Sequence, residues 1–143
     1  MGVAALITWV VTALGGFVLL GTWLGRGGMR QREGGASRFP PGLIFGHFLL
    51  AAAGLVLWIV YLATDAEALS WVAFAMLLVV ALLGFTMAAR WLQGRRVAVG
   101  ATAGTGAPFP AEQHFPVAVV ALHGLLAATT LVLVLLTALG AGD

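Results

Sequence analysis

Four long apolar runs constrain this chain most, because each of them is long enough to cross a lipid bilayer. A spanning helix needs about 20 predominantly apolar residues, and the runs lie at roughly residues 3–24, 42–64, 68–92 and 116–140. Hydrophobic residues make up 62% of the 143-residue chain and charged residues only 8%, unlike the balance of a soluble domain. Residues 1–143 are therefore predicted to form one all-α integral membrane domain, an up-down four-helix bundle.

The distribution of charge predicts the orientation of this domain. The ends of the runs near the turn between the second and third runs, together with the C-terminus, carry Asp65, Glu67 and Asp143 and no basic side chain. The arginines all lie on the opposite side. Short loops rich in arginine stay in the cytoplasm, so both termini are expected outside a bacterial plasma membrane, with Trp23 and Trp91 in the inner interfacial belt. All basic residues lie in or beside the connections between the first and second and between the third and fourth runs: Arg26, Arg30, Arg32, Arg38, Arg90, Arg95 and Arg96.

Two stretches of the chain repeat each other at a spacing of 76 residues. FPPGLIFGHFLLAAAGLVL (Phe39–Leu57) and FPVAVVALHGLLAATTLVL (Phe115–Leu133) agree at ten of nineteen positions, including Phe-Pro and a histidine. The helices before them, Ala13–Leu24 and Ala81–Leu92, both read Ala-Leu-x-Gly-Phe, five residues, Trp-Leu. The pattern predicts that residues 13–57 and 81–133 are two copies of one helical hairpin, related by a pseudo-two-fold axis along the membrane normal. The alternative is chance agreement within a small apolar alphabet.

His47 and His123 occupy the same place in the two copies, seven residues after Pro40 and Pro116. A rise of about 1.5 Å per residue puts each imidazole about 10 Å into its helix, so both share one depth. Successive helices are neighbours in such a bundle, which places the second and fourth helices on a diagonal roughly 12–14 Å long. Two imidazoles cannot easily touch across that gap, but a flat ligand with a central metal would fill it. Haem is such a ligand, and neutral imidazole is a good axial ligand for its iron.

Small residues follow each histidine on the same helix face, where they would leave room for a macrocycle. Small residues also simply allow membrane helices to pack closely, so they do not decide between the two interpretations. They are Ala51 and Gly54 after His47, and Ala127 and Thr130 after His123.

Arginines and the absence of cysteine complete the predicted site. Arg38 and Arg95, at the inner surface, are candidates for pairing with the haem propionates, because guanidinium binds carboxylate well. The chain has no Cys, which excludes disulfides, iron–sulfur clusters and covalent haem attachment. Its net charge of only +2 gives no sign of nucleic-acid binding. The predicted cofactor is therefore non-covalent haem b with His47 and His123 as metal ligands, while His114 is expected at the surface.

The paired Phe-Pro-x6-His helices resemble the ligand helices of small four-helix bacterial membrane b-type cytochromes. This resemblance implies a haem held between two histidines and single-electron exchange with a quinone or a membrane redox partner. It implies an electron carrier or subunit more than a stand-alone enzyme. Cytochromes of this class commonly stack two haems, whereas the outer half of this chain has no histidine. One haem in the cytoplasmic leaflet, and a place in a homodimer or larger complex, are therefore expected.

Several alternatives stay open at the level of sequence. The chain could be a non-catalytic accessory or assembly subunit without cofactor, or a membrane protein that handles or senses haem through the same histidines. The histidines could also hold a metal ion, a quinone or a pigment. A carrier or channel is disfavoured because no charged side chain lies deep in any predicted span. The linker Gln93–His114, rich in Gly, Ala and Thr, is expected to be flexible.

Overall fold

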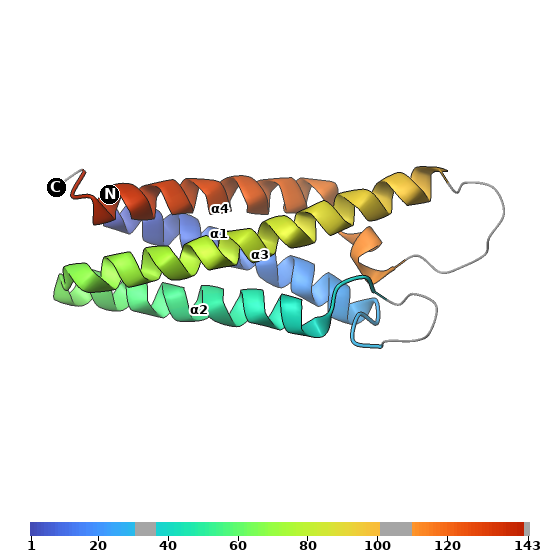
Figure 1. The fold of residues 1–143 in the computed structure, drawn as a ribbon, viewed down its shortest axis with the longest axis horizontal. Helices are drawn as coiled ribbons and strands as arrows, with labels where there is room; N and C mark the ends of the chain where they lie inside the picture. The colour runs from blue at the N-terminus through green and yellow to red at the C-terminus, as the bar shows by residue number, and fades with distance from the viewer. Residues whose placement is uncertain (31–36, 101–109, 142–143) are drawn as a thin grey trace.

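The computed structural model describes residues 1–30, 37–100 and 110–141, so Arg32 and Asp143 lie outside the described residues. The described chain is helical and contains no strand: α1 (Gly2–Gly25), α2 (Pro41–Thr64), α3 (Glu67–Gly100), the short 3-10 helix η1 (Ala111–His114) and α4 (Val117–Ala138). The long helices run up and down, and both chain termini lie at one end (Figure 1). Each of the four is long and apolar enough to cross a membrane, which confirms the predicted helical bundle.

The order of the helices around the bundle follows their order in the chain. α1 contacts α2 and α4, and α3 contacts the same two helices, so α2 and α4 lie on a diagonal as predicted. The predicted hairpins are α1 with α2 and α3 with α4. The most extensive contacts, however, join α1 to α4 and α2 to α3, so they run between the two hairpins. The bundle is therefore held together more by packing between the hairpins than within them.

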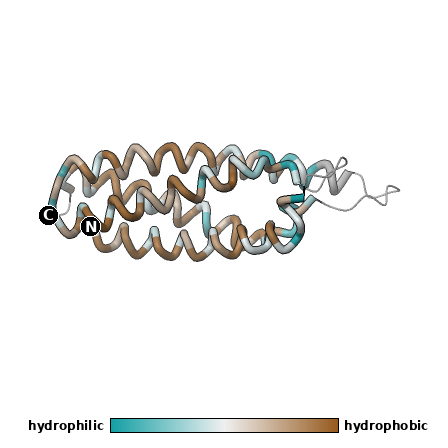
Figure 2. Tube along the Cα trace, turned by 90° about the horizontal axis from the view of Figure 1, so that it is seen from below, coloured by the Kyte–Doolittle hydropathy of each residue, from teal (hydrophilic) through white to brown (hydrophobic). Residues whose placement is uncertain are grey.

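The two ends of the bundle differ in chemistry. At one end, which we call the terminal end, the termini lie near the turn between α2 and α3. Asp65 makes that turn in a left-handed conformation (φ 53°), and Glu67 begins α3, where a carboxylate is favoured by the helix dipole. At the opposite, arginine end, α2 and α4 start beside Pro40 and Pro116, which need no helical partner for an N–H. Hydrophilic residues gather mainly at the arginine end (Figure 2).

Buried apolar side chains form two separate clusters. Trp23 (0% exposed) and Trp91 (5% exposed) fill the interior instead of an interfacial belt, so that prediction is wrong for both. Both indoles pack in one buried cluster with Phe39 and Ile44. The terminal-end cluster is Ala5, Trp9, Trp58, Ala73, Leu77 and Val134, and the arginine-end cluster is Trp23, Phe39, Ile44, Trp91 and Ala111.

The connection between α3 and α4 differs from the flexible linker that the sequence predicts. Helix α3 continues through Gln93 to Gly100, and Ala111–His114 forms η1; residues 101–109 lie outside the described residues. η1 contacts both α1 and α3, and Ala111 and Glu112 are buried. The prediction is wrong for these parts because composition does not show that η1 packs into the arginine end of the bundle.

Candidate functional site

His47 on α2 and His123 on α4 face each other across the bundle. Their ring centroids lie 6.3 Å apart, and the ring planes are inclined by 52°. The rings are closer than the helix axes because both side chains point inward. His123 lies against Gly16 of α1, which comes between Trp9 of one buried cluster and Trp23 of the other. The pair therefore occupies a layer between the two apolar clusters.

Each imidazole is held by a backbone carbonyl of the other hairpin. His47 Nδ1 lies 3.0 Å from the Val80 carbonyl oxygen on α3, and His123 Nδ1 lies 2.9 Å from the Thr12 carbonyl oxygen on α1. A carbonyl oxygen only accepts, so Nδ1 must carry the hydrogen, and Nε2 of the neutral ring keeps its lone pair. Metal-binding histidines are usually fixed in this way, with one nitrogen donating to an acceptor and the other free to coordinate.

A glycine accompanies each of these contacts. Gly84 follows Val80 by one helical turn, and Gly16 follows Thr12 by the same spacing. A Cβ atom at either glycine would lie 3.2 Å from Cε1 of the facing imidazole. Because a helical Cβ leans toward the preceding turn, it would push the ring away from the carbonyl. Both glycines belong to the repeated Ala-Leu-x-Gly-Phe motif, and that repetition is the signal that could have assigned them to the site.

The small residues predicted to line the cofactor have neighbours from other helices. A Cβ at Gly54 would lie 3.1 Å from Cζ2 of Trp9, so the glycine accommodates that indole. The Thr130 hydroxyl is buried and lies 3.0 Å from the Thr8 hydroxyl on α1. These two positions therefore make helix–helix contacts in this structure. The half-buried residues one turn beyond the histidines are Ala51 and Ala127.

The two predicted arginines both lie at the arginine end, beside neighbouring residues of α3. Nη1 of Arg38 lies 3.6 Å from the place that a Cβ of Gly94 would occupy. The guanidinium carbon of Arg95 lies 5.2 Å from the centroid of the Trp91 ring. His114 closes η1 and is exposed, as expected of a surface residue.

A buried carboxylate that the sequence did not single out joins the two linkers. Glu112 is 0% exposed; its Oε1 accepts the Arg38 backbone N–H at 2.8 Å and its Oε2 accepts the Ser37 hydroxyl at 2.8 Å. Ser37 Oγ also accepts the N–H groups of Trp23 (2.9 Å) and Phe39 (3.0 Å). Its lone pairs are thus occupied, and its hydrogen is directed to Glu112. The network ties the start of α2 to the segment before α4, the two helices that carry the histidines.

The chemistry of the donor set suits a haem better than a bare ion. Among the described residues, no group of three or more His, Cys, Asp or Glu side chains could hold a metal ion. A bare zinc ion takes four ligands, whereas haem iron needs only axial ligands from the protein because the macrocycle supplies the others. Two imidazole–metal bonds of about 2 Å and the ring radii add up to about 6 Å between ring centres. The ring centroids of His47 and His123 are 6.3 Å apart, which is close to this sum.

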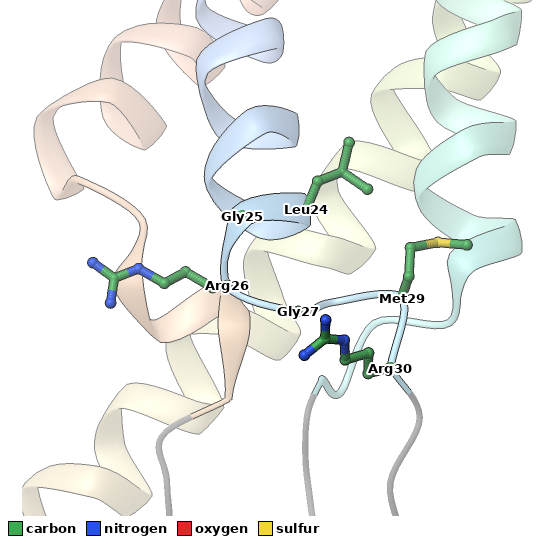
Figure 3. Close-up of a pocket in the computed structure, with 6 residues that line it drawn as sticks. All are labelled: Leu24, Gly25, Arg26, Gly27, Met29 and Arg30. Carbon is green, nitrogen blue, oxygen red and sulfur yellow. The ribbon is translucent and has the colours of Figure 1, made fainter.

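A pocket near the end of α1 is separate from this layer. Its volume is about 320 Å³, and the Arg26 side chain extends away from the side on which Leu24 and Met29 lie (Figure 3). Neither histidine takes part in it. The lining residues are Leu24, Gly25, Arg26, Gly27, Met29 and Arg30.

Fold and site together describe a class: an all-helical bundle of four helices, each apolar enough to span a membrane, with two facing histidines in its interior. Comparison of the chain with protein-family models, with curated proteins and with solved structures gives no match. The function must therefore be argued from the histidine pair and its surroundings.

Proposed function

We propose that this chain is a multi-pass protein of the bacterial plasma membrane that binds one b-type haem between His47 and His123 and exchanges single electrons with a quinone or a partner protein. The matched fixation of the two imidazoles carries the proposal. Each ring donates Nδ1–H to a carbonyl, and the ring centres lie 6.3 Å apart. The two imidazoles would hold the haem through their Nε2 atoms. Bound haem supplies one-electron chemistry through its Fe(III)/Fe(II) couple.

The proposal includes an internal duplication, and the burial pattern supports it. All four buried positions of α1 recur 68 residues later on α3, and two of the three buried positions of α2 recur 76 residues later on α4. Phe39 and Phe115, the equivalent residues before α2 and α4, approach each other with ring centroids 6.2 Å apart. The equivalent buried pairs are Ala5 and Ala73, Trp9 and Leu77, Thr12 and Val80, Trp23 and Trp91, Gly54 and Thr130, and Trp58 and Val134.

The residues around the pair would bind and orient the cofactor. The apolar clusters on either side of the histidine layer keep water away from it. Arg38 and Arg95 place positive charge at the arginine end, where propionates would be stabilised. The Glu112 network fixes the starts of the two ligand helices relative to each other.

The absorption spectrum of the protein purified in detergent tests this proposal. We expect a sharp Soret band that shifts on reduction, as for low-spin iron with two nitrogen ligands. The haem content should be one per chain. Apoprotein titrated with haem should reach the same spectrum. A protein that stays colourless, even after haem is added, would contradict the proposal and favour the accessory or assembly subunit.

We further propose that the arginine end faces the cytoplasm, as the positive-inside rule predicts. The native chain has no Cys, so single cysteines can report the orientation. Ala66→Cys, in the turn between α2 and α3, should react with a membrane-impermeant maleimide in intact cells. Met29→Cys, exposed at the arginine end, should react only after the membrane is opened. The reverse pattern of labelling would overturn the orientation.

A further inference from the structure

Trp91 carries a buried hydrogen-bond donor, the indole Nε1, that no described residue accepts. The side chain is 5% exposed, and among the described residues Nε1 has no hydrogen-bond partner. Buried donors in folded proteins nearly always have an acceptor, and leaving one unpaired is unfavourable. Trp23, at the equivalent place in the first hairpin, donates its indole N–H to Ser37 Oγ at 2.9 Å. Only one of the two equivalent indoles thus lacks an acceptor.

The groups around Trp91 show what kind of acceptor would fit. The Arg95 guanidinium lies over the Trp91 ring, and the Arg38 guanidinium lies against Gly94 on the next turn of α3. Glu112, the buried carboxylate at this end, already accepts one hydrogen bond on each oxygen. Among the described residues here, two guanidinium groups stand beside the one carboxylate of Glu112, so an anionic acceptor such as a carboxylate would fit.

The position of the indole relates this donor to the histidine layer. Trp91 is seven residues beyond Gly84, and seven residues make about two turns, so both lie on one face of α3. Gly84 touches the His47 ring. The indole is consequently about 10 Å along the helix from the histidine layer, toward the arginine end. If a ligand held in the histidine layer has a carboxylate on the edge nearer the arginine end, that carboxylate points toward the Trp91 indole.

We infer that the Trp91 indole N–H binds a carboxylate of the ligand held between His47 and His123, and that Arg38 and Arg95 balance the charge of this carboxylate. For haem b the carboxylate is a propionate. The inference rests on the proposed function and adds a residue that recognises one edge of the ligand. Ser37 already accepts the indole N–H of Trp23, so of the two equivalent indoles only Trp91 has a donor that no described residue accepts. The carboxylate edge of the ligand therefore turns toward Trp91, which gives the ligand one orientation.

A comparison of Trp91→Phe with Trp23→Phe tests this inference. Phenylalanine keeps an aromatic ring and removes the N–H. Each purified full-length variant is titrated with haem b and with haem dimethyl ester, in which both carboxylates are masked. We expect Trp91→Phe to weaken the affinity for haem b by about tenfold or more, the usual contribution of a hydrogen bond to a charged acceptor. The ester should bind Trp91→Phe and wild type equally, and Trp23→Phe should leave the preference for haem b over its ester unchanged.

The possible failures can be told apart. If Trp91→Phe weakens both ligands equally, or neither, while binding still depends on the histidines, the inference is wrong and the proposed function stands. If the wild type binds neither ligand, both are wrong. Should Trp91→Phe not fold, the ¹⁵N–¹H resonance of the Trp91 indole in wild-type protein decides. We expect it to differ between the complexes with ferrous haem b and with the ferrous ester, and identical resonances would refute the inference.

Discussion

His47→Ala and His123→Ala are each expected to abolish the low-spin bis-histidine haem spectrum. Either substitution removes one of the two proposed axial nitrogens, and no other ligand-type side chain joins the pair in the described part of the chain. Loss of a residue that only orients a metal ligand already weakens metal binding about 10–100-fold. Loss of a ligand itself should therefore lower haem affinity at least a hundredfold, or leave five-coordinate, high-spin iron. Absorption spectra of the oxidised and reduced proteins distinguish these results from the wild type.

Two further variants calibrate this experiment. His114→Ala changes a histidine that is exposed and outside the pair, so its spectrum should match the wild type. Gly84→Ala keeps both ligands but puts a methyl group 3.2 Å from the His47 ring, against its carbonyl contact. We expect this variant to bind haem about 10–100-fold more weakly while staying low-spin when saturated. If both ligand variants kept the wild-type spectrum, the assignment of the axial ligands would be wrong.

Glu112→Ala is expected to lower the free energy of unfolding by about 3 kcal/mol. The substitution removes the acceptor of the Ser37 hydroxyl and of the Arg38 backbone N–H, and each such bond to a charged group contributes about 1.5–3 kcal/mol. The Arg38 N–H would lose its partner, and the Ser37 hydroxyl would keep only its longer contact of 3.4 Å to the Phe39 carbonyl oxygen. The measurement is reversible unfolding of the detergent-solubilised protein, followed by circular dichroism.

Glu67→Ala and Glu112→Gln are the matched controls. Glu67 is exposed at the start of α3, so its removal should change stability by about 0.5 kcal/mol or less. Glutamine at position 112 keeps the shape of the side chain, but its NH₂ group would face one of the two donors where glutamate has an acceptor oxygen. Ser37 Oγ cannot accept that group because it already accepts two N–H groups. Glu112→Gln should therefore fall between Glu112→Ala and wild type. Equal stability of Glu112→Ala and Glu67→Ala would show that the network contributes nothing.

Sequence alone predicted the features that depend on length, periodicity and repetition. The four long helices follow from runs of about 20 apolar residues. The shared depth of His47 and His123 follows from their equal distance, seven residues, from Pro40 and Pro116. Composition was also sufficient to exclude the chemistries that need cysteine.

The remaining features depend on which way single side chains turn, and composition carries no such information. Trp23 and Trp91 are tryptophans near the ends of predicted spans, which is typical of an interfacial belt, yet their indoles face the interior. Gly16 and Gly84 are ordinary small residues until the imidazoles are seen against them. Glu112 is one acidic residue in a linker rich in Gly and Ala, and only its two hydrogen bonds show its role.

The reciprocal carbonyl contacts have a consequence for biogenesis. His47 is anchored by the Val80 carbonyl and His123 by the Thr12 carbonyl, so neither half of the polypeptide contains both an imidazole and the carbonyl that holds it. During synthesis the His47 contact can therefore form only after the third helix has been made. Under the proposed function, both imidazoles would be fixed to receive the ligand only once the two halves have packed together.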